Sequence, residues 1–255
     1  PPALDEYTAF EQDTSDDAYQ RVVERLLASP QYGVRWARHW LDVAGYAESD
    51  GQIVNDRMRP FAWRYRDYVV DALNRDLPYD QFLIEQLAGD QLIEGIPDPN
   101  DDEHARLLAA TGLLQMAPDL TESEDTLLNR NQAVADTMAT VTSAILGLTV
   151  ACAQCHDHRY DPITIEDYYS LRAVFDPAMP IHQWKKPSQR LVDMTNDQTK
   201  AERARIESEA VALQEDINTR RRAHCQTIQD REIKAAPDEV RELLRTAVNT
   251  PPEQQ

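Results

Sequence analysis

Two cysteines and a histidine stand together in this sequence at a spacing that suits covalent attachment of a cofactor. Cys152 and Cys155 are three positions apart, and His156 follows the second cysteine directly. Cys-x-x-Cys-His is the attachment pattern of c-type haem. Two thiols on one turn of backbone can reach the two vinyl groups of a porphyrin, and the adjacent imidazole can take an axial position on the iron. The motif therefore predicts one covalent haem c, anchored by Cys152 and Cys155, with His156 as proximal ligand.

The same stretch permits two other assignments. Cys152, Cys155 and His158 could be three ligands of a zinc ion that a histidine from elsewhere completes. The Cys-x-x-Cys pair could also close as a disulfide or act as a redox dithiol. His158 lies too near His156 to reach the opposite face of the same ring, so we expect it to orient a ligand or to contact a propionate. Cys225 lies far away in a polar segment and is expected to be a lone thiol on a helix surface.

A second axial ligand would have to come from another part of the chain, and His39 is the first candidate. The helix predicted over residues 32–47 carries an apolar face that we expect to be buried, formed by Trp36, His39, Trp40 and Val43. A histidine in such a face is either hydrogen-bonded within the core or available to the iron. Asp42 could orient the His39 ring through its N–H group.

Two further groups could bind parts of a cofactor or a cation. Arg64 and Arg66 alternate with aromatic residues in a helix predicted over 60–76. Guanidinium groups bind carboxylates through paired hydrogen bonds, so these arginines could hold the haem propionates, or could pair with the chain's own acids. The oxygen-rich loop over 48–56 is either a solvated turn or a site for calcium, although its spacing matches no defined calcium loop.

The spacing of apolar residues predicts an all-α fold. Long stretches follow the helical period, with fifteen prolines, only seven glycines and little alternation. The longest clean helical period extends over 124–150 and leads directly into the motif, with an apolar stripe formed by Val134, Met138, Val141, Ile145 and Leu148. Thr164 and Asp167 have the spacing of a capping box that starts the next helix. We expect an irregular multi-helix domain around haem in residues 1–180. A linker and a polar helical extension toward a further domain follow in 181–255.

The charge of the chain limits its partners. A formal net charge of −19 and a pI near 4.6 argue against nucleic acid and against anionic lipid surfaces. No apolar run approaches the length of a membrane span. An acidic surface suits solubility outside the cytoplasm and pairing with a basic redox partner. The chain begins at Pro1 without an initiator methionine or a signal-peptide pattern, which indicates a mature or excised fragment.

Several blocks of this sequence together carry a resemblance to a known family. They lie at residues 25–33, 35–44, 63–68, 78–82, 85–90, 146–162 and 167–169. These blocks resemble the planctomycete cytochrome-c-like domain family, which occurs in large secreted proteins with a haem motif, and the resemblance extends over about residues 1–180. One departure is Gly45, where the family usually has an arginine before Tyr46, so any cofactor contact made by that arginine in relatives is absent or replaced here.

The resemblance implies a periplasmic or extracellular protein with further domains in the same polypeptide, whose reaction is not established. The leading hypothesis is covalent haem c in extracytoplasmic electron transfer. A haem enzyme of peroxidase or oxidase type, acting on a carbohydrate-derived substrate, is the second, with a distal pocket drawn from Trp36, Trp40, Tyr46 and Arg64. A binding or scaffold domain stabilised by zinc or calcium, without haem, is the third.

Overall fold

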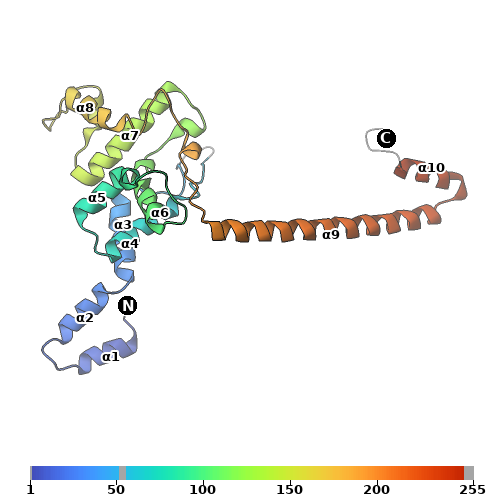
Figure 1. The fold of residues 1–255 in the computed structure, drawn as a ribbon, viewed down its shortest axis with the longest axis horizontal. Coiled ribbons are helices and arrows are strands. Elements are labelled where there is room, and N and C mark those ends of the chain that lie inside the picture. Colours follow the sequence, from blue (N-terminus) through green and yellow to red (C-terminus); the bar gives the residue numbers. More distant parts are fainter. Residues whose placement is uncertain (1, 52–55, 250–255) are drawn as a thin grey trace. The chain divides into compact units, whose positions relative to one another are not determined.

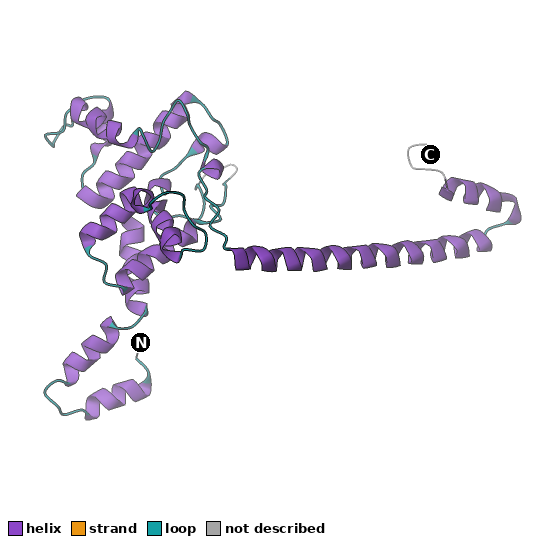
Figure 2. Ribbon diagram, in the orientation of Figure 1, coloured by secondary structure: helices purple, strands orange, loops and turns teal. Residues whose placement is uncertain are grey.

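The computed structural model describes residues 2–51 and 56–249, and these residues fold almost entirely into helices (Figures 1 and 2). Within them, the only pairing of extended backbone is an isolated bridge between Ser49 and Met58. The predicted all-α class is therefore confirmed. The chain divides into two compact units, one ending at Met194 and the other starting at Thr195.

The first unit contains the helices that surround the motif. Its α-helices are α1 (Leu4–Gln12), α2 (Ala18–Leu27), α3 (Gln31–Val43), α4 (Ala62–Asn74), α5 (Tyr79–Ala88), α6 (Asp102–Ala110), α7 (Leu127–Leu146) and α8 (Ile165–Phe175). Short 3₁₀ helices connect them: η1 (Gly89–Leu92), η2 (Thr111–Gln115), η3 (Leu120–Glu122), η4 (Val150–Gln154) and η5 (Pro187–Gln189). The second unit consists of α9 (Asp197–Ala235) and α10 (Asp238–Asn249).

A first hydrophobic core forms where α3 packs closely against α4. A Cβ atom on Gly33 would lie only 2.4 Å from the carbonyl oxygen of Val70, so the two backbones nearly touch. Such close packing buries the two small residues of α3, Gly33 and Ala37, and leaves large side chains outside. The predicted burial of the tryptophan face is therefore wrong: Trp36 and Val43 are each 51% exposed. His39 is exposed as well, and only Trp40 on that face is partly buried.

Helix α7 links this core to a second hydrophobic cluster. Val141 packs into the first core, whereas Val134 and Met138 pack into the second. The second cluster also includes residues of η4 and α8, namely Val150, Ala153 and Tyr168, together with Met179. The predicted stripe of α7 is thus confirmed at Val134, Met138 and Val141. The helix ends at Leu146, however, so Leu148 lies beyond it and is 38% exposed.

The second unit contains one long polar helix. The sequence predicts a polar helical extension in this part of the chain, and α9 forms it as one continuous helix of 39 residues (Figure 1). It starts at Asn196, whose side chain accepts a hydrogen bond from the backbone N–H of Thr199. None of its side chains is buried. Cys225 is an exposed free thiol on this helix, as expected.

Candidate functional site

A tight turn at the end of α7 directs the chain into the motif. Gly147 adopts the left-handed conformation, with φ of 65°. Its backbone N–H donates to the carbonyl oxygen of Ser143, and the N–H of Leu148 donates to that of Thr142. This hydrogen-bonded reversal is a common helix C-terminus, and glycine adopts it without the steric cost of a Cβ atom. The turn allows η4 to pack against α7.

The 3₁₀ geometry of η4 separates its buried residues from its thiols. With three residues per turn, side chains three positions apart lie above one another. Val150 and Ala153 form one such column, and both are buried in the second hydrophobic cluster. Cys152 lies within η4, and Cys155 follows its last residue, with its backbone N–H donating to the carbonyl oxygen of Cys152. Both thiols are free and exposed, so the motif combines accessible thiols with a turn that is fixed in the core through Val150 and Ala153.

His156 is exposed and oriented by the backbone. Its Nδ1 atom lies 2.8 Å from the carbonyl oxygen of Asp157. A carbonyl oxygen can only accept a hydrogen bond, so this contact requires the proton on Nδ1. The unprotonated Nε2 is then the atom available to a metal, which is the arrangement that metal-bound histidines commonly adopt.

His158 holds the following loop together. Its Nδ1 atom accepts hydrogen bonds from the backbone N–H groups of Tyr160, at 3.3 Å, and Asp161, at 2.9 Å. Its own backbone N–H donates to the carbonyl oxygen of Ile163. The side chain is only 6% exposed. Because Nδ1 is used within the loop, only Nε2 of His158 could contact a cofactor.

The start of α8 is bonded to the motif and completes the site. The predicted capping box is confirmed: the Thr164 hydroxyl accepts from the backbone N–H of Asp167, and the Asp167 carboxylate accepts from that of Thr164. These hydrogen bonds lower the pKa of Asp167. Asp157 accepts from the backbone N–H of Ile165 at 2.9 Å. The motif and the first turn of α8 therefore form one hydrogen-bonded structure.

Two tyrosines of α8 contact this structure, and the sequence motif gave no sign of them. Tyr169 donates its hydroxyl hydrogen bond to the carbonyl oxygen of Gln154, between the two cysteines. Tyr168 is 1% exposed, and its hydroxyl has no hydrogen-bond partner among the described residues. Burial raises the pKa of Tyr168. The capping box indicates only that both lie in the first turns of a helix that starts nine residues after His156; their contacts depend on tertiary packing.

His39 lies in a separate groove. This groove, of about 440 Å³, is lined by residues of α3, α4, α5 and α7. The ring of His39 lies 5.4 Å from that of Trp36, and Trp40 lines the same groove. No hydrogen bond joins His39 to Asp42 within the described part of the chain, and Asp42 lines a different groove on the other flank of α3. No residue of the cysteine motif is among the lining residues of the His39 groove.

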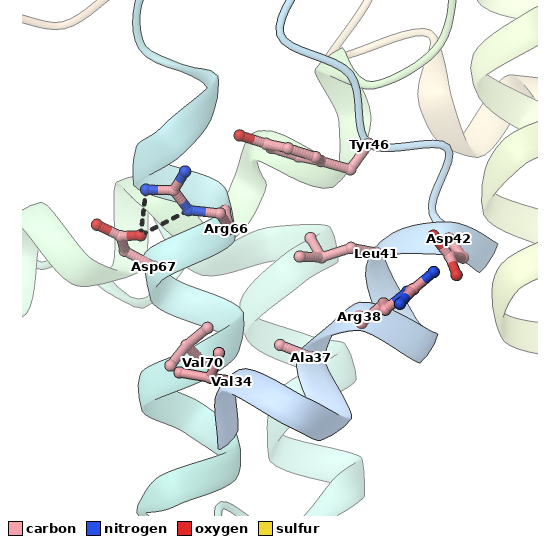
Figure 3. A pocket seen from close by; sticks show the side chains of 9 residues that line it. All are labelled: Val34, Ala37, Arg38, Leu41, Asp42, Tyr46, Arg66, Asp67 and Val70. Carbon is pink, nitrogen blue, oxygen red and sulfur yellow. Dashed lines mark hydrogen bonds and ion pairs between the residues drawn. The ribbon is translucent and has the colours of Figure 1, made fainter. Parts of the chain in front are cut away.

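The two predicted propionate-binding arginines have other partners in this structure. Arg66 lines the groove that also contains Asp42, where both its Nε and Nη2 atoms lie 2.9 Å from Oδ1 of Asp67 (Figure 3). Arg66 also approaches Glu48 at 3.4 Å. Arg64 stacks on the ring of Trp63, with 4.7 Å between the guanidinium carbon and the ring centroid. Arg66 thus pairs with the chain's own acids, as in the alternative assignment, whereas the contact found for Arg64 is with an aromatic ring.

The oxygen-rich loop is organised by arginines where the structure describes it. Asp50, whose side chain is 3% exposed, accepts hydrogen bonds from Arg57 at 2.9 Å and Arg59 at 2.8 Å. Arg59 also donates to the carbonyl oxygens of Met116 and Ala117. The charge of this carboxylate is thus already balanced. Asn55, part of the predicted calcium loop, lies outside the described residues.

Covalent haem and a bare metal ion require different sets of donor atoms. Between residues 2 and 249, leaving out 52–55, no three His, Cys, Asp or Glu side chains converge as a metal site would require. Covalent haem needs only two accessible thiols on one turn and an imidazole with a free nitrogen. Cys152, Cys155 and His156 meet these requirements.

The fold and the site define a class: an all-α domain with a Cys-x-x-Cys-His turn fixed on its hydrophobic core. The chain belongs to the PSCyt2 family, described as a protein of unknown function (DUF1549), whose sequence model matches residues 1–179. This is a planctomycete cytochrome-c-like domain family, so the resemblance seen in the sequence is confirmed. No curated protein and no solved structure matches the chain. Among the described helices, none has the length and apolar character needed to cross a membrane.

Proposed function

We propose that this chain carries one covalent haem c and transfers electrons outside the cytoplasm. The supporting observation is that both thiols of the turn at η4 are free and exposed, while Val150 and Ala153 of the same turn pack into the core. Cys152 and Cys155 would form the thioethers, and Nε2 of His156 would bind the iron. The bound haem would supply a one-electron redox centre. Localisation outside the cytoplasm is part of the proposal, since covalent haem attachment in bacteria takes place there.

His39 is the proposed second axial ligand. Its ring makes no hydrogen bond that the described residues show, so both its nitrogens are available. The test is His39→Ala in haem-loaded protein, with optical spectra and the reduction potential as readouts. Loss of the low-spin spectrum supports the assignment. An unchanged spectrum and potential would remove His39 from the site.

The haem-enzyme alternative receives less support from the structure. The residues expected to form the distal pocket of such an enzyme are Trp36, Trp40, Tyr46 and Arg64. Trp36 and Trp40 line one groove and Tyr46 the other, and Arg64 lines neither. Burial and a hydrogen bond to Glu48 raise the pKa of Tyr46 to about 12, so this phenol stays protonated at neutral pH. Peroxide turnover that His156→Gly abolishes would nevertheless favour an enzyme.

The deciding experiment is expression in a host with periplasmic haem-maturation machinery. We expect c-type optical spectra, a pyridine haemochrome of the thioether type and an intact mass increased by one haem. The double variant Cys152→Ser, Cys155→Ser should lose all three signals, whereas the control Cys225→Ser should keep them. Colourless wild-type protein without added mass would contradict the proposal, and analysis for zinc and calcium would then follow.

A further inference from the structure

Helix α9 carries an exposed apolar stripe that follows a regular spacing. The stripe positions run at steps of four, three, four, four, three and four residues and are occupied by Ile206, Ala210, Leu213, Ile217, Arg221, His224 and Ile228. This is two eleven-residue repeats, a period that keeps one side of a long helix facing a partner helix. Ile206, Leu213 and Ile217 are 53%, 64% and 55% exposed. These apolar side chains therefore have no cover within the described chain.

The spacing of the stripe is the same in both directions from Ile217. If two copies of α9 lay antiparallel about a two-fold axis at Ile217, every stripe position would face another stripe position. Ile206 of one copy would face Ile228 of the second, and Ile217 would face its own symmetry mate. In a parallel pair, by contrast, Arg221 and His224 would each face themselves, placing like charges in the seam.

The charges of α9 also favour the antiparallel arrangement. Residues 197–216 contain six acidic and three basic side chains, a net charge of −3, whereas residues 217–235 contain five basic and two acidic, a net charge of +3. An antiparallel partner places each acidic half along a basic half. The helix dipole does not account for this pattern, because it acts only on the first and last turns and the sign changes at the middle of the helix.

Individual charges beside the stripe agree with the same register. In this register Glu202 of one copy would face Glu232 of the second, with Arg203 and the second copy's Arg231 beside that pair. Two acidic and two basic side chains would therefore meet at each end of the stripe, and their charges would balance. Within one helix Glu202 and Arg231 are separated by 29 residues, or about 43 Å, and pair instead with Arg205 and Glu232 respectively.

We propose that α9 is a self-association surface through which two copies of this chain pair antiparallel, centred on Ile217. The proposal does not depend on the haem, because every residue that it uses lies in the second unit. The occupant of the stripe is a second copy rather than another protein, because both the stripe spacing and the charge distribution are self-complementary.

The test is sedimentation equilibrium of the full chain at low and high salt. We expect a dimer whose dissociation constant rises with salt. Glu202→Lys and Arg231→Glu should each raise that constant roughly tenfold, since each leaves both four-residue charge groups of the dimer with two excess charges of one sign. An equimolar mixture of the two variants should return to the wild-type value, because each variant then faces the complementary one. Ile217→Lys should leave only monomer.

Glu215→Lys is the matched control, since it makes the same charge change on the side of the helix away from Ile217. It should leave the dissociation constant unchanged, and circular dichroism should show equal helix content in all variants. A wild-type chain that stays monomeric would overturn the proposal and leave α9 as a solvated spacer. If the dissociation constant does not return to the wild-type value when the two variants are mixed, the antiparallel register is wrong.

Discussion

At the scale of single residues, the first unit contains a buried carboxylate whose charge must be compensated by its neighbours. Glu85 is fully buried, and it accepts hydrogen bonds from the hydroxyl of Tyr68 at 2.9 Å and from both terminal nitrogens of Arg106. Arg106 is also paired with Glu103, and its side chain is 13% exposed. A buried charge is tolerated only when its partners remain in place. These residues therefore join α5 to α6 through an ion pair and α5 to α4 through a hydrogen bond.

Removing the arginine should destabilise the domain strongly. We expect Arg106→Ala to lower the free energy of unfolding by about 3–5 kcal/mol, because it leaves the Glu85 carboxylate buried without its cation. Arg75→Ala is the control: Arg75 pairs with Asp71 on the surface, with both side chains about half exposed. Loss of such a pair costs about 0–1 kcal/mol. Urea denaturation measures the free energy of unfolding of both variants. Equal losses would contradict the claim that burial of Glu85 makes its ion pair the more important one.

The same carboxylate should make stability depend on acid pH. Burial raises the pKa of Glu85, but the hydrogen bonds from Arg106 and Tyr68 outweigh burial and hold the pKa below its usual 4.5. A pKa that is lower in the folded state stabilises the fold above the unfolded-state value, and this stabilisation is lost as the pH falls through the folded-state value. We therefore expect Glu85→Gln to be less stable than wild type at pH 7, with a difference that narrows below pH 4.5. Thermal unfolding of both proteins across this pH range measures the difference in stability. A difference that stays constant with pH would contradict the prediction.

At the scale of elements, the turn after α7 sets the position of the motif. Gly147→Ala should lower the free energy of unfolding by about 1–2 kcal/mol, since a Cβ atom is unfavourable at a φ of 65°. Gly147→Asn should cost less, because asparagine tolerates this conformation. Denaturant unfolding gives the stability, and the yield of haem-loaded protein reports whether the motif is misplaced. Equal losses of stability in the two variants would mean that the left-handed conformation at residue 147 is not the cause of the loss.

The sequence allowed some of these elements to be predicted and not others. The stripe of α7 and the capping box of α8 were predictable because they depend on residues close together in the chain. The exposure of Trp36 was not, because it follows from the contact of Gly33 with Val70, which are distant in sequence. In the same way, the Cys-x-x-Cys-His spacing identifies the motif itself. The hydrogen bond from Tyr169 to Gln154 depends on tertiary packing and has no local signature.

At the scale of the whole molecule, the two units should be separable. Both hydrophobic clusters consist entirely of residues before Met194. We expect a chain that ends at Met194 to keep the melting temperature and the haem-loading yield of the longer chain, and to lose only its self-association. Calorimetry and sedimentation measure these properties. A markedly lower melting temperature would show that α9 or α10 contributes to the stability of the first unit.

The net charge of −19 should govern the rate of electron exchange. The segment 157–172, which follows the motif, contains four acidic and two basic side chains, so the negative potential extends to the proposed haem site. Such a potential attracts cations and repels anions over a distance that salt shortens, from about 10 Å at 0.1 M to about 3 Å at 1 M. We therefore expect haem-loaded protein to react faster with a cationic ruthenium hexaammine reagent than with an anionic iron cyanide at low salt, after correction for driving force. The two rates, measured by stopped flow, should converge as salt is added. Rates independent of salt for both reagents would contradict electrostatic steering and, with it, the preference for a basic redox partner.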